Sequence, residues 1–158
     1  MGIVDPDMQG QGLRWLQMTD DEIDAFLGRG GTGVLSFATG SDEPPVSIPI
    51  SYGYNADEGL LYYQLSTSAD SRKSDLVDEP VAFVAYDRLD NRWESVIATG
   101  TLDDIDGKPY ESSAVQGMWA IEIPRVDIFE RPREEVTFHF FSLDPDTLTG
   151  RKEVPSRP

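Results

Sequence analysis

The chain of 158 residues contains no cysteine and a single histidine, His139. The absence of cysteine excludes disulfides, cysteine-ligated zinc and thiol catalysis. One histidine is too few for a zinc site built from several histidines, and a Ser-His-Asp triad would have to use His139. The G-x-S-x-G motif of a nucleophilic serine is also absent. The sequence therefore disfavours the common hydrolytic and zinc-dependent sites, and we expect His139 to be structural.

Positive charge is scarce, because 13 Lys and Arg face 29 Asp and Glu and the net charge is −16. Such a surface repels DNA, RNA and anionic membranes, so we expect no nucleic-acid and no membrane partner. Lysine occurs only at Lys73, Lys108 and Lys152, and aspartate outnumbers glutamate. Short carboxylates in place of long lysine stems keep a protein hydrated in salt, which favours a halophilic protein. The alternative is an acidic protein without salt adaptation.

Long hydrophobic runs are missing as well. No apolar run approaches the roughly 20 residues that a membrane-spanning helix needs. The N-terminus has no basic segment followed by an apolar one, as a signal peptide would have. With 39% hydrophobic residues the chain is long enough for one domain with its own core. We therefore expect a cytoplasmic protein.

The first regular element predicted is a short helix. Thr19 and Glu22 form the pattern of a capping box, apolar residues follow at helical spacing, and Gly28 ends the pattern. Beyond it the hydrophobic period changes to two, which is typical of strands. A second short helix is predicted just before Pro80. Strands are predicted over 33–39, 46–54, 60–65, 81–87, 93–105, 118–124 and 136–144.

These elements predict a mainly β fold with short helices. About six or seven strands with regularly spaced turns favour an antiparallel barrel or sandwich. Pro49 lies inside a strand, which indicates a sheet edge or a bulge, and Gly100 indicates a bulge or bend. We expect an extended arm over 1–18, one folded domain over 19–145 and a polar, mobile tail over 146–158.

The segment from Ser66 to Lys73 gathers anion-binding groups in a chain that is otherwise short of them. Ser66, Thr67, Ser68 and Ser71 precede the pair Arg72 and Lys73 at the start of a predicted helix. Hydroxyls, free amides at a helix start and two cations together make a phosphate seat. The residues alone leave a second interpretation open, namely a polar loop that caps a helix.

From Thr19 to about Ile105 the chain resembles the FMN-binding split-barrel family, the pyridoxamine 5′-phosphate oxidase-like flavoproteins. The resemblance lies in the order of several motifs rather than in any single one. It implies a split β-barrel, antiparallel and Greek-key-like. The motifs are TDDEIDAFL, GVLSFAT, PVSIPISY, LLYYQL, STSADSRKSDL, PVAF and the strand that carries Trp93, Ser95 and Gly100.

The resemblance also implies a cofactor and a partner. In that family two subunits form a homodimer and FMN lies at the subunit interface. Arg72 and Lys73 would then bind the FMN phosphate, helped by Ser66 and Thr67. A rich set of aromatic residues also favours a partner surface, where such side chains are enriched. These residues are Tyr52, Tyr54, Tyr62, Tyr63, Trp93 and Trp119.

By the same resemblance, the backbone around Pro49, Ile50 and Ser51 would border the edge of the isoalloxazine ring. A strand with a proline leaves amides and carbonyls available to such a ring. Ser95 would contribute from the barrel wall. The chain shows no counterpart of the C-terminal Arg and His set that binds pyridoxal phosphate in true pyridoxamine phosphate oxidases, which disfavours vitamin B6 oxidation.

The function expected from the resemblance is FMN-dependent oxidoreduction of a small-molecule substrate, with no catalytic residue assigned. One alternative is a flavin-binding or flavin-storage module without turnover. Another is a split barrel that binds the deazaflavin F420 or haem. The acidic tail of F420 would need cations such as Arg125, Arg131 and Arg133, and haem would need His139 as its axial ligand.

Overall fold

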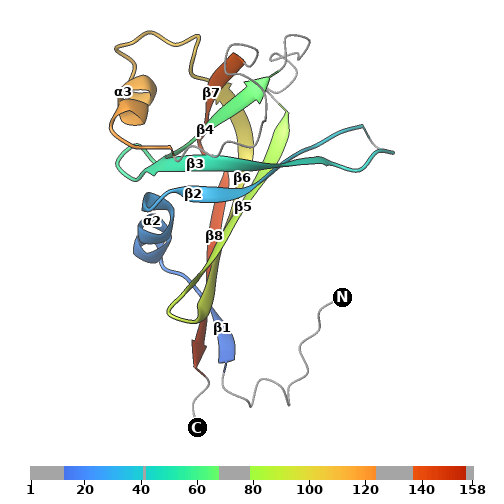
Figure 1. Cartoon of the computed structure of the whole chain (residues 1–158), viewed down its shortest axis with the longest axis vertical. Coiled ribbons are helices and arrows are strands. Elements are labelled where there is room, and N and C mark those ends of the chain that lie inside the picture. The colour runs from blue at the N-terminus through green and yellow to red at the C-terminus, as the bar shows by residue number, and fades with distance from the viewer. Residues whose placement is uncertain (1–12, 41, 68–78, 124–136, 156–158) are drawn as a thin grey trace.

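The computed structural model describes residues 13–40, 42–67, 79–123 and 137–155 (Figure 1). Within these ranges the chain forms eight strands and two helices. The elements are β1 (Leu13–Gln17), α2 (Asp20–Gly28), β2 (Gly31–Phe37), β3 (Val46–Asn55), β4 (Leu60–Thr67), β5 (Pro80–Leu89), β6 (Arg92–Asp104), α3 (Ser113–Trp119), β7 (Thr137–Leu143) and β8 (Thr147–Pro155).

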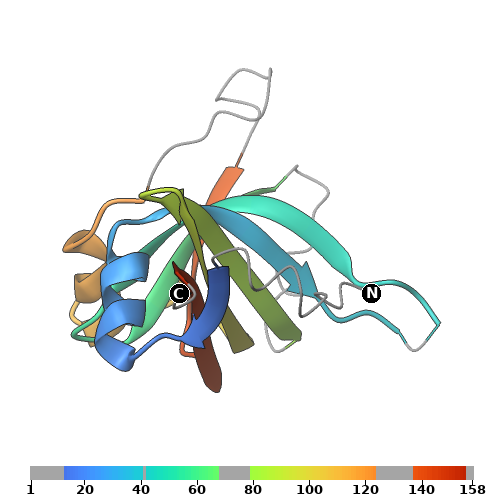
Figure 2. The ribbon, with the colours of Figure 1, turned by 90° about the horizontal axis from the view of Figure 1, so that it is seen from below.

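The eight strands form one antiparallel sheet in the order β1-β8-β6-β5-β2-β3-β4-β7. A further pairing between β6 and β7 closes part of this sheet into a ring, and β8 and β1 extend from β6 outside the ring. The predicted split barrel is therefore confirmed. Figure 2 shows both helices on one side of the sheet and the β2–β3 hairpin projecting on the other.

The barrel splits along β6 at Gly100. The first half of β6 pairs with β8, and its last residues pair with β7. Between the two, a Cβ on Gly100 would lie 2.9 Å from Leu143 Cδ1 and 3.1 Å from the Asp144 carbonyl oxygen. The Asp146 N–H donates to the Thr99 carbonyl at 2.7 Å, so the β7–β8 turn packs directly on β6. The glycine serves this close approach within a continuous strand.

The core lies inside the ring because inward residues alternate with outward ones along each strand. Phe83 stands between two tyrosines, with its ring centroid 5.1 Å from that of Tyr52 and 5.0 Å from that of Tyr63, both edge to face. Each fully buried large apolar side chain contributes about 1.5–3 kcal/mol relative to an exposed one. The core also includes Leu35, Phe37, Ile50, Leu61, Leu65, Val81, Val96, Leu102, Phe141 and Leu143.

The capping box predicted for the first helix is confirmed. The Glu22 N–H donates to Thr19 Oγ1 at 3.2 Å, and the Thr19 N–H donates to Glu22 Oε1 at 3.0 Å. Glu22 also pairs with Lys152 of β8. The hydrogen bond from Lys152 is the main cause that lowers the pKa of Glu22. The buried side chains of Ile23, Phe26 and Leu27 pack in the core. The helix is therefore attached to the barrel by apolar packing as well as by the ion pair.

Two predictions about the C-terminal half were wrong. Residues 118–124 were expected to form a strand, but Met118 and Trp119 end α3 and residues 120–123 are turn and coil. Val115, Met118 and Ile121 recur at intervals of three, which suits a helical face. The expected mobile tail is also wrong for β8, which pairs with β6 on one side and β1 on the other.

Other predictions are confirmed or lie outside the described residues. The strands predicted over 33–39, 46–54, 60–65, 81–87, 93–105 and 136–144 correspond to β2, β3, β4, β5, β6 and β7 with small differences at their ends. Part of the expected N-terminal arm is β1. The helix predicted before Pro80 falls on residues that are not described.

We predict that Gly100→Ala destabilises the fold by about 1–3 kcal/mol, since the added methyl group must displace Leu143 or the β7–β8 backbone. Gly28→Ala is the matched control, because nothing lies within 4 Å of the position and it belongs to α2. There alanine should be neutral or stabilise by up to about 1 kcal/mol. Urea denaturation of both variants measures the difference, and equal stabilities would contradict the packing role of Gly100.

Candidate functional site

The ladder between β3 and β4 stops before either strand does. β3 pairs with β2 along residues 46–52, but it pairs with β4 only from Tyr52 to Asn55. Residues 46–51, which we call the β3 edge, therefore have a described strand on one side only. Pro49 lies in this edge, as its missing N–H predicted. A free edge offers N–H and C=O groups to a ligand.

Ser51 is the unusual residue of the β3 edge. Its neighbours Ile50 and Tyr52 are buried in the core, so Ser51 belongs to the opposite face of the strand. Its Oγ is buried, yet it has no hydrogen-bond partner in the described structure. A buried hydroxyl without a partner costs about 1–3 kcal/mol. Pro49, Ile50 and Ser51 follow one another along the β3 edge. Their backbone groups therefore lie next to the Ser51 hydroxyl, which lacks a partner in the described structure.

Ser66 and Thr67 lie on β4, on the other side of the point where β3 and β4 stop pairing. They are the last residues of β4 and pair with Phe138 and Thr137 of β7 rather than with β3. Continued beyond the Tyr52–Tyr63 pair, the β3–β4 register would set Ser66 opposite Pro49. The two predicted groups, on β3 and on β4, therefore flank the point where the strands part. Arg72 and Lys73 lie outside the described residues, so their role stays a prediction.

Ser95 is not brought to this place within one chain. It lies on the outward side of β6, where it pairs with Tyr86 of β5 and Arg151 of β8. The strands β5 and β2 stand between β6 and β3. At about 4.8 Å per strand, Ser95 is roughly 14 Å from Ser51 along the sheet. Ser51 and Ser95 are therefore not adjacent within one chain.

The sequence reasoning missed a cover over the outer side of β3 and β4, formed by residues 113–123. The Tyr62 hydroxyl donates to the Ala114 carbonyl at 2.7 Å, and Asn55 Nδ2 donates to the Gly117 carbonyl at 3.0 Å. Apolar side chains of the cover pack with Tyr62 in a second cluster outside the barrel. The spacing of Val115, Met118 and Ile121 at intervals of three is the sequence pattern that could have predicted the helix in this cover.

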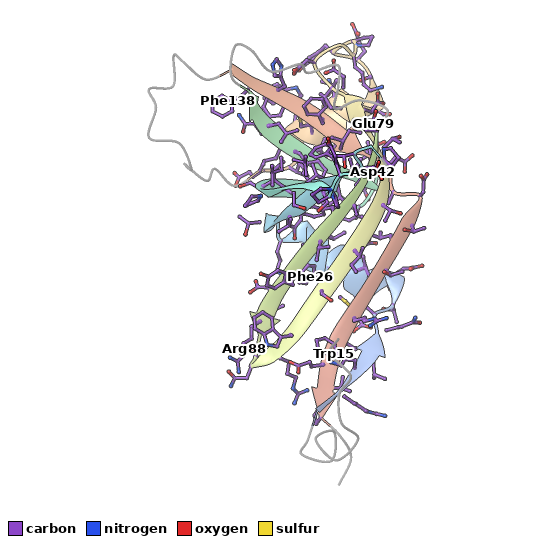
Figure 3. All side chains as sticks on the ribbon, turned by 90° about the vertical axis from the view of Figure 1, so that its right-hand side faces the viewer. Trp15, Phe26, Asp42, Glu79, Arg88 and Phe138 are labelled. Atoms are coloured by element: carbon purple, nitrogen blue, oxygen red, sulfur yellow. The ribbon has the colours of Figure 1, made fainter. Side chains whose placement is uncertain are left out.

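A second feature is a set of exposed apolar side chains on the outward side of β5 and β6 and on β1, beyond the intervening strand β8, which we call the outer face. Trp15 is 48% exposed, Tyr86 59%, Trp93 40% and Ile97 44%. The rings of Tyr86 and Trp93 touch, with centroids 5.9 Å apart. Figure 3 views these long strands, with Trp15 and Arg88 labelled near one end. Soluble monomers rarely expose apolar groups gathered in this way.

Of the other aromatic residues expected at a partner surface, Trp119 is 69% exposed at the end of α3, but four tyrosines are not available to a partner. Tyr52, Tyr54, Tyr62 and Tyr63 are all buried within the chain, so their number reflects the barrel and its cover. Burial is the main cause that raises the pKa of Tyr52 and of Tyr62 to about 12. Burial also raises the pKa of Tyr54, with a further contribution from its hydrogen bond to Asp24.

His139 takes part in a local polar contact. It lies on β7 opposite Leu65, and its Nδ1 is 3.1 Å from Asp106 Oδ2. Among the described residues, no group of three or more His, Cys, Asp or Glu side chains is placed to hold a metal ion. Nor does any helix in these ranges have the length and apolar character to span a membrane.

Comparison with known proteins gives a family and a set of similar folds. A family model described as pyridoxamine 5′-phosphate oxidase matches residues 19–152. No curated protein matches the chain. The solved FAD-binding protein of Mycobacterium smegmatis is 17% identical, with a TM-score of 0.62, and the match covers 90% of this chain and 98% of that chain.

Two further solved structures are similar. A FAD-binding protein of Mesorhizobium loti is 16% identical, with a TM-score of 0.58, and the match covers 90% of this chain and 98% of that chain. The FAD and haem binding protein of M. smegmatis is 17% identical, with a TM-score of 0.57 and coverage of 90% and 76%. At these identities the likeness shows the fold.

We predict that the protein loses stability as the pH rises above about 10. The raised pKa values of Tyr52 and Tyr62 mean that the unfolded chain releases these protons first. Their stabilising effect is therefore complete below about pH 10 and is lost as the pH rises towards 12. Thermal melts from pH 8 to pH 12 should show a falling Tm, and the share of tyrosinate absorbance that comes from the four buried tyrosines of the six should appear together with unfolding. Ionisation of these tyrosines well before unfolding would contradict their burial.

Proposed function

Because the chain belongs to the pyridoxamine 5′-phosphate oxidase family, we propose that it binds a flavin where β3 and β4 separate. The observation that carries this proposal is the buried Ser51 Oγ without a partner, beside the free backbone of the β3 edge. One edge of the isoalloxazine ring carries carbonyl oxygens and an N–H group. The hydroxyl and the backbone groups of residues 49–51 supply both donors and acceptors for it.

Apolar side chains beside the β3 edge also suit the isoalloxazine ring. Val34 of β2 is the cross-strand partner of Pro49, so apolar side chains border the polar groups of the β3 edge. A small-molecule site of this kind needs mostly apolar walls with a few well-placed polar groups. When bound, a flavin supplies two-electron redox chemistry, and the protein supplies binding, orientation and exclusion of water. We propose oxidoreduction of a small molecule, with a flavin-binding module without turnover as the alternative.

The flavin that we propose is FMN. Its phosphate would be held by Arg72 and Lys73, helped by Ser66 and Thr67, because this segment follows the end of β4 directly. In a chain of net charge −16, a phosphate is repelled at long range and its affinity must come from local contacts. The FAD-binding proteins with the same fold make FAD the alternative ligand, and mass spectrometry of the purified protein separates the two.

We further propose a two-fold symmetric homodimer formed through the outer face. The exposed side chains of Trp15, Tyr86, Trp93 and Ile97 are of the kinds that gather in the buried centres of interfaces. A second copy would also explain how Ser95, far from Ser51 in one chain, contributes to a flavin site. The flavin would then lie at the subunit interface.

We predict that the purified protein carries a flavin spectrum and that Arg72→Ala and Lys73→Ala each weaken FMN binding about ten- to a hundred-fold. A charge-assisted hydrogen bond contributes about 1.5–3 kcal/mol, which accounts for this range. Titration of the deflavinated protein with FMN measures the change. Arg92→Ala is the control, since Arg92 is exposed at the β5–β6 turn. Unchanged affinity in the double variant would refute the phosphate assignment.

Turnover separates the two proposed roles. Reduced nicotinamide and an electron acceptor, added to flavin-loaded protein, should be consumed by an oxidoreductase and left unchanged by a storage module. Protein that binds neither FMN nor FAD at micromolar concentration would refute the proposed function itself.

We predict that the double variant Tyr86→Asp/Ile97→Asp is monomeric, because two added charges per subunit would have to be buried in the outer-face interface. Tyr110→Asp is the control, since this side chain is 67% exposed and lies outside that face. Sedimentation at micromolar concentration gives the oligomeric state. The wild-type dimer should be tighter in molar KCl, where the Debye length is about 3 Å and the acidic subunits repel less. A wild-type monomer in both salts would exclude the dimer.

A further inference from the structure

The cover of residues 113–123 rests directly on the backbone of β3 at one position, Gly53. A Cβ at this position would lie 2.7 Å from Ile121 Cδ1, 3.0 Å from the Glu122 carbonyl oxygen and 3.2 Å from Ile123 Cγ1. The first contact involves the end of a flexible side chain, but the second involves backbone. Any side chain at position 53 would therefore push residues 121–123 away from the strand.

Gly53 and Ser51 share one face of β3. Tyr52 and Tyr54, which alternate with them, are in the barrel core, so residues 51 and 53 both belong to the outer side. Residues two apart on a strand are about 6.6–6.8 Å from each other. The cover thus contacts β3 at a residue only about 6.6–6.8 Å along the strand from Ser51, whose hydroxyl is buried.

We propose that Gly53 is a positioning residue, which lets residues 121–123 rest on β3 and so keeps the Ser51 hydroxyl free of water and available to the ligand at the β3 edge. This inference rests on the proposed flavin site. A hydroxyl that water cannot reach makes a stronger hydrogen bond to a ligand than one that water can also reach. Without the cover, water would satisfy the Ser51 Oγ and the advantage of the ligand would shrink.

A hydrogen bond from the Ser51 hydroxyl would also change the midpoint potential of a bound flavin. Hydrogen bonds and charge near the ring tune the electronics of a flavin. A reduced flavin carries more negative charge on its ring than an oxidised one, so a dry donor favours the reduced form. Exposure or removal of the Ser51 hydroxyl should therefore lower the midpoint potential as well as the affinity.

The test is a double-mutant cycle on FMN binding with Gly53→Ala and Ser51→Ala. Each single variant should weaken FMN binding about tenfold, the loss of one hydrogen bond of about 1.4 kcal/mol. The double variant should be little weaker than either single one, because both act through the same hydroxyl. An additive loss of about a hundredfold would show two independent effects and would overturn the proposal.

Two further variants test whether the loss of FMN affinity is specific to the Ser51 hydroxyl and to the clash at position 53. Ser36→Ala is the control for Ser51→Ala, since Ser36 lies on β2, outside the β3 edge, and its hydroxyl is already bonded to that of Ser47 at 2.8 Å. It should leave FMN affinity and midpoint potential unchanged. Adding Ile121→Ala to Gly53→Ala removes the nearest clashing atom and should restore part of the affinity. A midpoint potential unchanged in both Ser51→Ala and Gly53→Ala would also overturn the proposal.

Hydrogen exchange in the protein without FMN tests the cover by itself. In Gly53→Ala the hydrogen-bonded amides of the cover, those of Gln116 and Ile121, should exchange faster than in the wild type, while those of the barrel interior keep their protection. Equal exchange would show that Gly53 does not seat the cover and would overturn the proposal. Wild-type protein that binds no FMN would instead refute the proposed function, and the exchange result would still decide the role of Gly53.

Discussion

The structure depends on one interruption, the end of the β3–β4 ladder at the Tyr52–Tyr63 pair. Pro49 has no N–H to give to a neighbouring strand, which suits its place in a part of β3 that has a described strand on one side only. β4 instead continues along β7, and β7 reaches β6 to close the ring. The barrel thereby keeps a closed core, while residues 46–51 have no strand on their second side within the described part of the chain. Ser51, Ser66 and Thr67 lie on these two diverging strands, whereas Ser95 lies on β6.

Among the described residues, the side chains inside the ring pack against one another, which favours the outer surfaces for binding. Large side chains such as Phe83 and Tyr63 fill the ring, and a close-packed interior has no room for a ligand of flavin size. On the outer side of β3 the cover rests on Gly53, and the β3 edge ends two residues away at Ser51. The Ser51 hydroxyl is buried there and has no partner among the described residues. The exposed outer face is the second unfilled surface, and a second copy of the chain would fill it.

Much of the fold could be predicted because alternation and capping are local signals. Thr19 and Glu22 form the capping box as expected, and Pro49 marks an edge. β8 was missed because TLTGRKEVP is polar, and its strand conformation comes from backbone pairing between β6 and β1, which composition does not record. The cover was missed because Met118 to Ile123 alternates like a strand, while its packing on Gly53 depends on a distant residue. The distance between Ser51 and Ser95 follows from strand order, which no local pattern contains.

The net charge of −16 also explains why the site should depend on short-range contacts. A surface of this sign lowers the concentration of anions around the protein, so a phosphate-bearing ligand gains nothing from steering. A hydrogen bond from a dry hydroxyl is screened little by salt, whereas repulsion between exposed carboxylates is screened strongly. Rising ionic strength would therefore weaken the repulsion, while the contact that we propose at Ser51 would stay nearly intact. A site built from a covered hydroxyl and free backbone groups is thus the kind that an acidic chain retains over a wide range of salt.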